Sequence, residues 1–239
     1  MFRNLFYLFF FLSASAVYCQ IQWHSRSRLM DFDKYYRNVI QETVYEVEKR
    51  GWSSLRFNDN ITQTLGEVLY DWHFNGSVTY TNGFLVSVQQ LQVTNTQQFI
   101  NNRTLPDNST ALFAGVQGRF FMRDTRVGFD VYVQLLNEDK PQWYTGIYNH
   151  QTVEFSLTIQ KNLRTNEMST SSTLQSLSAG IGNRMVYMPA NNVTEALSRV
   201  YVPSNNWNGI RDWGTAVFAP IMLDIAKNHI AFPKFCLGC

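Results

Sequence analysis

The side chains best suited to chemistry are four histidines, His24, His73, His150 and His229. None of them lies in the His-Glu-x-x-His spacing that places two zinc ligands and a base on one helix face. No Gly-x-Ser-x-Gly segment presents a serine nucleophile on a strained turn. The sequence therefore contains no motif for zinc-dependent hydrolysis or for the common serine hydrolases.

Two further patterns fall short of a cofactor or ion site. The Gly-Ile-Gly segment at 180–182 lacks the third glycine and the following helix of a dinucleotide-binding loop. Asp31 and Asp33 lack the glycine and the closing glutamate of a calcium loop. Carboxylates such as Asp130 and Glu138 are expected on solvated faces. We therefore expect no catalysis, no cofactor and no metal. A hydrolase whose site assembles from distant residues stays an alternative.

Residues 1–19 have the layout of a secretory signal peptide. A basic residue precedes an apolar core from Leu5 to Leu12, and small residues follow. A helix that crosses a bilayer needs about 20 apolar residues, and this apolar core is shorter, which argues against a transmembrane anchor. We favour cleavage after Cys19, with cleavage after Ala16 as the alternative. The expected product is a secreted, extracellular protein with one domain, residues 20–239.

Cys236 and Cys239 are the cysteines that remain after this cleavage. In an oxidising compartment they are expected to form a disulfide with each other or with another chain. A bridge between them closes a very short loop, so its loss is expected to change stability little. A redox role would need a helix N-terminus, whereas this pair follows Pro233 at the end of the chain. A zinc site would need two more ligands, and His229 and His150 are the weakly spaced candidates.

The composition indicates which classes of partner and modification to expect. The formal net charge is +2 and only 16% of the residues are charged, so the chain lacks the basic footprint of a nucleic-acid binder. Five Asn-x-Ser/Thr sequons lie behind the leader and predict glycosylation at exposed positions. They are at Asn60, Asn75, Asn102, Asn108 and Asn192. A polar segment, Gln97–Asn108, is expected to be a loop that carries the glycan.

Two amphipathic helices are predicted. From Asp31 to Arg50 apolar residues recur at helical spacing, with Asp31 as the N-cap and Gly51 at the end. A second stripe occupies residues 206–230, where Pro220 is expected to kink or divide the helix. Because the polar face of the first helix mixes both charge signs, a helix lying on a membrane surface is the less favoured alternative.

The strongest strand pattern runs from Ala111 to Leu136. Apolar residues occupy alternate, even-numbered positions before Arg123–Arg126 and alternate, odd-numbered positions after it. This pattern predicts a hairpin of two long strands. A second hairpin is expected at Asn82-Gly83, and a bulge is expected near Gln89-Gln90. Further strands are predicted at residues 143–148, 153–159 and 168–177.

These elements predict an α+β fold in which one long, strongly curved antiparallel sheet wraps around two long amphipathic helices. Residues 75–91 read NGSVTYTNGFLVSVQQL, where a glycine opens a strand, a turn follows and a second strand leads to Leu91. With the leader, the two helices and the meander, the chain resembles the mite group 7 allergen family and its insect relatives over roughly residues 31–232. That family is similar in fold to half of the bactericidal/permeability-increasing protein, in the tubular lipid-binding superfamily.

The resemblance implies an apolar groove and a non-catalytic, allergen-like protein that binds a lipid or other apolar small molecule. Takeout and juvenile-hormone-binding proteins of that superfamily usually have an N-terminal disulfide, which is absent here after Cys19, so the group 7-like branch is favoured. The expected lining residues are Tyr36, Ile40, Val44, Val86, Leu112, Val116, Phe120, Phe129, Val131, Val133, Phe155, Leu157, Ile159, Phe218, Ile221 and Ile225.

Two other functions stay open. One is a secreted structural or adhesion glycoprotein whose core is filled, and the other is the hydrolase considered above. Transient contact with a membrane surface is compatible with the carrier, whereas binding to nucleic acid is not expected. The sequence does not indicate the ligand or the oligomeric state.

Overall fold

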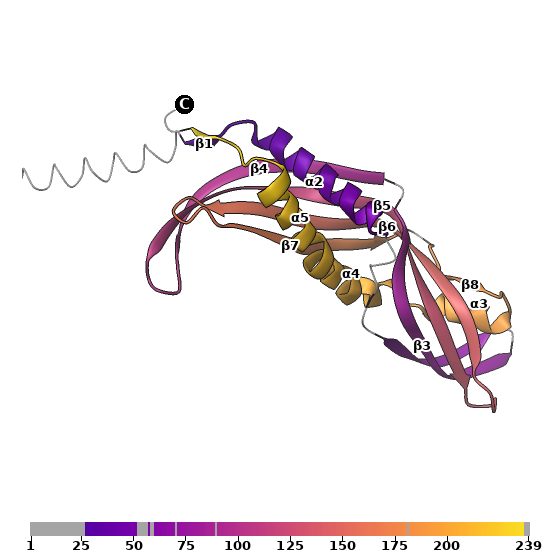
Figure 1. Ribbon diagram of the computed structural model, residues 1–239. Coiled ribbons are helices and arrows are strands. Elements are labelled where there is room, and N and C mark those ends of the chain that lie inside the picture. The colour runs from indigo at the N-terminus through magenta and orange to yellow at the C-terminus, as the bar shows by residue number, and fades with distance from the viewer. Residues whose placement is uncertain are drawn as a thin grey trace, which may run out of the picture.

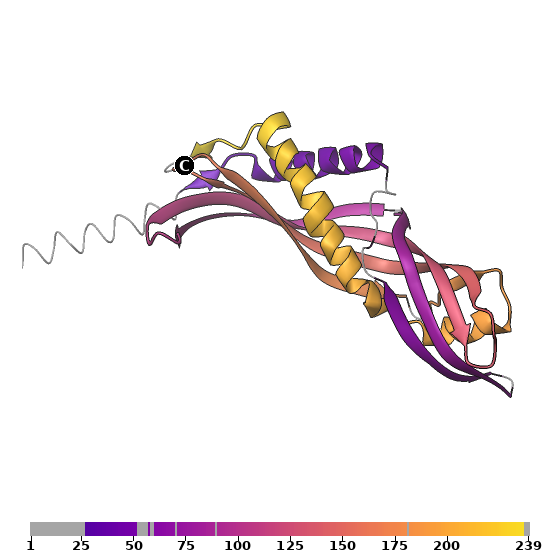
Figure 2. The same ribbon diagram turned by 60° about the horizontal axis from the view of Figure 1, so that its bottom comes forward.

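The computed structural model describes residues 27–51, 57, 60–69, 71–88, 90–180 and 182–236. The predicted leader and Cys239 lie outside these ranges. Within them the chain forms an α+β structure that is mostly antiparallel sheet, with few helices (Figure 1). The sheet is open, and the helices lie against its two halves (Figure 2).

Two very long strands run through the whole sheet. β5 (Thr110–Leu135) has 26 residues and β6 (Gln142–Asn162) has 21. They keep one antiparallel register from the pair Phe113↔Asn162 to the pair Val133↔Gln142. Each is several times longer than the average strand of about 5–6 residues. This strand pair therefore forms the axis to which the remaining elements attach.

The hairpin predicted at residues 123–126 is wrong, because β5 continues through it. Asp124 has φ 50°, and the buried positions change there from even numbers, ending at Met122, to odd numbers from Thr125. A residue in the left-handed region distorts the pleat without ending the strand. A polar break with a change of parity thus fits a distorted strand as well as a turn.

The turn predicted at Asn82-Gly83 is wrong for the same reason. β3 (Trp72–Ser87) passes through Asn82, which has φ 52°, and its register against β5 shifts between Thr81 and Phe84. β4 (Gln90–Thr104) then pairs with the rest of β5, so that β3 and β4 together follow its entire edge. The bulge expected near Gln89-Gln90 is the break between these two strands, at a position where Gln89 is not described.

The other strands divide the sheet into two halves. β7 (Met168–Ala179) pairs with one half of β6, opposite β4. β8 (Val186–Met188) pairs with the other half, and β2 (Ile61–Leu69) extends that half beyond β3. The strand expected at 168–177 is confirmed as β7. The two strands expected at 143–148 and 153–159 are both parts of β6. The loop expected from Gln97 begins only after Thr104.

A small second sheet joins the two ends of the described chain. β1 (Arg28–Leu29) pairs with β9 (Phe235–Cys236), and the Met30 amide donates to the Lys234 carbonyl at 3.0 Å. Residues more than 200 positions apart in the sequence are thereby held side by side next to the start of α2. This pairing closes the end of the half of the sheet that contains β4.

The first predicted helix is confirmed as α2 (Phe32–Lys49). Gly51 follows it with φ 79°, as expected for a glycine that ends a helix, and its amide donates to the Glu48 carbonyl at 2.9 Å. The proposed capping role of Asp31 is wrong, because this residue has φ 52° and its side chain makes no cap hydrogen bond.

The second long helix is not formed as one α-helix. Residues 207–229 form the run α4 (Trp207–Trp213), η3 (Gly214–Phe218), α5 (Ala219–Asp224) and η4 (Ile225–His229), in which η3 and η4 are π-helical. Pro220 lacks the N–H that an α-helix would use at that position. The preceding turn is π-helical, and the Ala219 amide bonds to the Gly214 carbonyl.

Helices cover the two halves separately, so the sheet does not wrap around a helical pair as expected. α2 lies against β4 and β5, and α5 lies against β7 and α2. α3 (Asn192–Val200) lies against β2 and β8 at the other end, and the 3₁₀ turn η2 (Pro203–Asn206) links it to α4 (Figures 1 and 2).

The hydrophobic core is continuous, and each half of it holds its own cluster of aromatic rings, which we call its aromatic core. In the β4 half, Phe120 stacks on Phe218 with ring centroids 5.3 Å apart. Tyr36 approaches Gly118 so closely that a Cβ there would lie 2.7 Å from its ring. In the other half, Tyr80 and Tyr187 share a hydrogen bond of 2.9 Å. Both cores therefore use close aromatic packing on the same two strands.

A buried polar group marks the junction between the halves. His150 of β6 is fully buried and lies opposite Thr125 of β5. Its Nε2 is 2.8 Å from the Asn206 amide nitrogen, and the Asn206 carbonyl oxygen accepts from the Tyr201 hydroxyl at 2.7 Å. Burial lowers the pKa of His150 from 6.5 to about 4. The folded protein thus holds this imidazole neutral.

We predict that His150 makes the fold sensitive to mild acid. Because its folded pKa lies below its unfolded pKa, the unfolded chain binds more protons, and stability falls as the pH drops from 6.5 towards about 4. The full effect is roughly 3 kcal/mol. Urea unfolding between pH 7 and pH 4.5 should show a shallower loss for His150→Gln than for the wild type. The exposed His73→Gln control should retain the wild-type slope, and equal slopes for all three proteins would contradict this assignment.

Candidate functional site

The predicted lining residues lie in the two aromatic cores. Thirteen are buried, Val44 and Leu112 are half-buried, and Val86 is 38% exposed. The buried ones are Tyr36, Ile40, Val116, Phe120, Phe129, Val131, Val133, Phe155, Leu157, Ile159, Phe218, Ile221 and Ile225. Phe129, Val131 and Val133 lie in the β3 half, apart from the residues around Phe120. The thirteen buried residues nevertheless belong to one continuous hydrophobic core, against which Val44 packs, whereas Leu112 and Val86 are not part of it. The role of the set in ligand binding stays a prediction.

Phe129 tests how tightly this core is filled. Its ring is fully buried and lies 5.9 Å from the ring of Tyr80. Phe129→Ala should lower the free energy of unfolding by about 3–5 kcal/mol, because the surrounding side chains cannot close the void. Val86→Ala, at a half-exposed position of β3, should cost less than about 0.5 kcal/mol. Urea denaturation measures both. A small loss for Phe129→Ala that becomes large after organic extraction would show a ligand filling the void.

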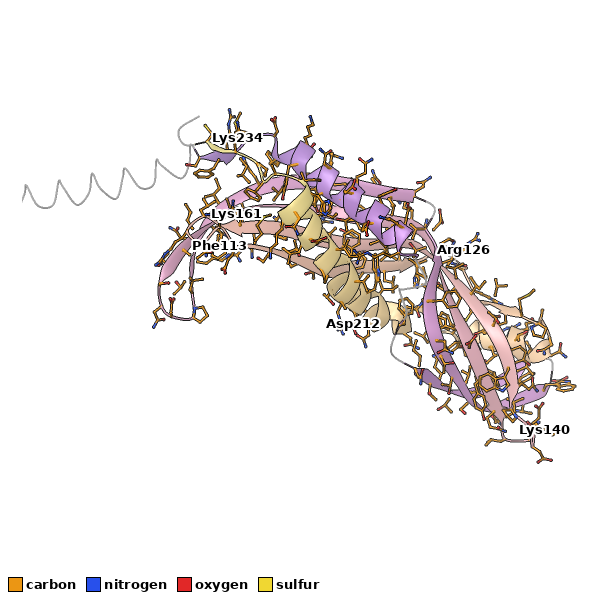
Figure 3. The ribbon with its side chains drawn as sticks, in the orientation of Figure 1. Phe113, Arg126, Lys140, Lys161, Asp212 and Lys234 are labelled. Carbon is orange, nitrogen blue, oxygen red and sulfur yellow. The ribbon has the colours of Figure 1, made fainter. Side chains whose placement is uncertain are left out.

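Two cavities lie at opposite ends of the molecule and are lined by other residues. One lies beside Lys234, and the other lies near the turn that carries Lys140 (Figure 3). We call the first the α2 cavity and the second the Trp72 pocket. None of the sixteen predicted lining residues contributes to either of them.

The α2 cavity has a volume of about 440 Å³. It forms where the chain enters α2 and where the segment after η4 returns to pair with β1. Its lining residues are Met30, Asp31, Lys34, Tyr35, Asn38, Ile230, Ala231, Phe232, Pro233 and Lys234. Tyr35 and Phe232 meet edge to face with ring centroids 5.5 Å apart. Six of these side chains are apolar or aromatic, and the polar ones are exposed at the rim.

Two features make this cavity suited to an amphiphile. Its charged lining residues are two cations, Lys34 and Lys234, and one anion, Asp31, so the cavity carries a net positive charge. The Tyr35 hydroxyl is buried and has no hydrogen-bond partner among the described residues, and burial raises the pKa of this phenol. A buried donor without a partner is unfavourable unless another group satisfies it. An apolar body with a polar or anionic head matches this combination.

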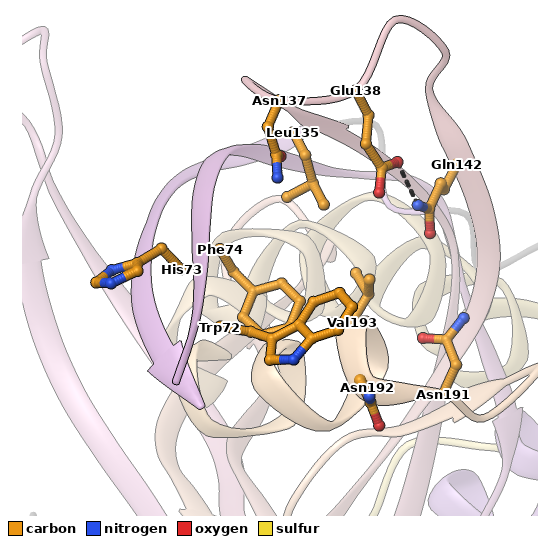
Figure 4. Close-up of a pocket in the computed structure, with 10 residues that line it drawn as sticks. All are labelled: Trp72, His73, Phe74, Leu135, Asn137, Glu138, Gln142, Asn191, Asn192 and Val193. Carbon is orange, nitrogen blue, oxygen red and sulfur yellow. Dashed lines mark hydrogen bonds between the residues drawn. The ribbon is translucent and has the colours of Figure 1, made fainter. Parts of the chain in front are cut away.

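The Trp72 pocket has a volume of about 380 Å³ and lies among the β2–β3 hairpin, the β5–β6 turn and the start of α3. Trp72, Phe74, Leu135 and Val193 form its apolar side (Figure 4). Asp71, with φ 66°, makes the tight turn that brings Trp72 to the pocket. Phe74 and Leu135 are buried beneath it, whereas Trp72 is 63% exposed.

The opposite side of this pocket is polar. Gln142 donates to the Glu138 carboxylate and accepts from the Tyr144 hydroxyl. The Asn191 amide donates to that hydroxyl at 3.0 Å, and Asn191 also caps α3 by accepting from the Thr194 amide at 3.0 Å. These bonds connect the β5–β6 turn to α3 through side chains. The polar wall is therefore fixed before any ligand binds.

No sequence pattern predicts either cavity, because each is assembled from the ends of elements far apart in the chain. Trp72 lies between Tyr70 and Phe74 in the sequence, with nothing that marks it as a site residue, and Phe232 follows the second apolar stripe without continuing it. Their neighbours become apparent only when the strand pairing is known.

The predicted modification sites are accessible. All five sequon asparagines are exposed, and Asn192 also lines the Trp72 pocket. Cys236 in β9 is not a free thiol, whereas Cys19 and Cys239 lie outside the described residues. The pairing of Cys236 with Cys239 therefore stays a prediction.

Within the described ranges no cluster of three or more potential metal ligands is found. No helix described here has both the length and the apolar character needed to cross a bilayer. Comparison with models of known families and with curated proteins finds no match to this chain.

Proposed function

We propose that this is a secreted, non-catalytic protein that binds a lipid or other apolar small molecule, and that the ligand occupies the α2 cavity. The observation that carries the proposal is the combination of a largely apolar cavity with two lysines, Lys34 and Lys234, at its rim. Ligand sites are usually mostly apolar, with a few polar groups that fix orientation. The volume of about 440 Å³ also falls in the usual range for such sites.

The charges suggest how the ligand would lie. Its apolar part would contact Tyr35 and Phe232 at the centre of the cavity. Its polar or anionic head would face Lys34 and Lys234 at the rim. Lys161, whose Nζ lies 5.7 Å from the Phe232 ring centroid, adds a third cation near that ring. An acidic or phosphate-bearing amphiphile fits this arrangement better than a neutral hydrocarbon.

The resemblance to the mite group 7 family supports the same function. We propose that the half-sheet covered by α2 and the α4–η4 run corresponds to half of a tubular lipid-binding fold. Phe120 of the sheet stacks directly on Phe218 of the helical run. A ligand between sheet and helices would therefore require these two rings to separate. The α2 cavity needs no such movement, which is why we place the ligand there.

A structural or adhesion role is the second candidate. The observation that favours it is the close packing of the thirteen buried residues predicted to line a groove. In such a protein the core would be filled at native density and would hold no ligand.

Filling the α2 cavity should abolish ligand binding. Ala231→Trp places a large ring at an exposed lining position, whereas Ala179→Trp makes the same change at the exposed end of β7. In titrations with a fluorescent fatty-acid analogue, we expect saturable binding by the wild type and by Ala179→Trp. Ala231→Trp should bind at least about tenfold more weakly, the loss of about 1.4 kcal/mol. Absence of saturable binding by the wild type would favour the structural candidate.

Secretion and glycosylation have a separate test. We expect the secreted product to begin near Gln20 and to carry glycan on Asn102 or Asn108, both of which are exposed at the β4–β5 end of the sheet. N-terminal sequencing and mass measurement before and after glycosidase treatment check this. A secreted product that retains residues 1–19 and does not change mass would be incompatible with this expectation.

A further inference from the structure

We propose that the Trp72 pocket binds a saccharide, through a site that is separate from the α2 cavity. The pocket combines one aromatic, apolar wall with one wall of fixed amide and carboxylate groups (Figure 4). A sugar ring has the same division, because its C–H groups form apolar faces and its hydroxyls project from the ring edge.

The apolar wall is built for stacking. Trp72 is 63% exposed, although its neighbours Phe74 and Leu135 are buried. The π-face of an aromatic ring carries partial negative charge and attracts the weakly positive C–H groups of a ligand. A single exposed tryptophan is common on protein surfaces and alone would mean little. Here it lines a pocket, with a polar wall within reach of the same ligand.

The polar wall has hydrogen-bonding capacity to spare. Each amide side chain has two N–H donors and a carbonyl with two lone pairs, and a carboxylate accepts several hydrogen bonds. The bonds that join Glu138, Gln142 and Asn191 through Tyr144 use only part of this capacity. Asn137 and Asn192 add further amides to the lining. Vicinal hydroxyls, each a donor and an acceptor, can use such mixed groups.

The same wall favours binding over hydrolysis. Glycoside hydrolysis generally uses two carboxyl groups on either side of the scissile bond. Among the lining residues of the Trp72 pocket, Glu138 supplies the only carboxylate. The chemistry available is therefore recognition.

The saccharide has two potential sources. It belongs to another molecule, or it is the N-glycan of this chain, because Asn192 is a sequon residue that itself lines the pocket. In the second case the first sugar of the glycan would pack against Trp72 and tie α3 to the β2–β3 hairpin. Both sources present the same chemistry to the two walls.

The test compares Trp72→Ala with Trp143→Ala, a matched control. Trp143 is 62% exposed and lies outside the pocket, where its ring meets Tyr132. Ligand-observed NMR with glucose, galactose, mannose, N-acetylglucosamine and chitobiose supplies the probes, using the full chain produced in a bacterial host that adds no N-glycan, so that Asn192 keeps its own side chain. We expect at least one probe to bind. Trp72→Ala should weaken that binding at least about tenfold, as for a dominant contact residue, whereas Trp143→Ala should leave it unchanged.

The glycosylated wild type then distinguishes the sources. If it binds the same probe as the unglycosylated protein, the site serves an external saccharide. If only the unglycosylated protein binds, the chain's own glycan occupies the pocket. Failure of every probe to bind the unglycosylated protein, or an equal loss in Trp72→Ala and Trp143→Ala, would overturn the proposal. Thermal unfolding of both alanine variants checks that each is folded, and fatty-acid binding at the α2 cavity should be the same in both.

Discussion

The unbroken antiparallel pairing of β5 with β6 is the constraint on which the rest of the structure depends. From Phe113↔Asn162 to Val133↔Gln142 the two strands keep a constant register while the buried parity changes at Asp124. A shift of one residue would turn every apolar side chain of a half to the wrong side. Because both halves share these strands, their two aromatic cores must form together. The buried His150, opposite Thr125, lies where they meet.

Local pattern predicted much of this fold but not its connectivity. The helical periodicity of α2 and the glycine that ends it were sufficient to place that helix. The alternation on both sides of Arg123–Arg126 was also interpreted correctly as strand. The alternation could not distinguish a turn from a left-handed residue inside one strand. Either one changes the buried positions from even to odd numbers. Only the pairing with β6, more than twenty residues away, decides between them.

The two cavities were beyond sequence-based prediction for a related reason. The α2 cavity requires that Met30 lie beside Lys234, and the Trp72 pocket requires that Asn191 reach Tyr144. Both contacts join the ends of distant elements, where no periodicity operates. The predicted lining residues, by contrast, followed periodicity and were placed in the cores. Apolar alternation identifies side chains that are buried on folding, but it does not indicate whether they pack against another side chain or against a ligand.

Binding of a lipid or other apolar molecule is the central functional claim, and native mass spectrometry of the protein secreted by its own cells tests it most directly. The account predicts a mass above that of the glycosylated chain, which organic extraction removes and which Ala231→Trp does not retain. A native mass equal to that of the glycosylated chain, unchanged when the purified protein is incubated with fatty acids, would contradict it.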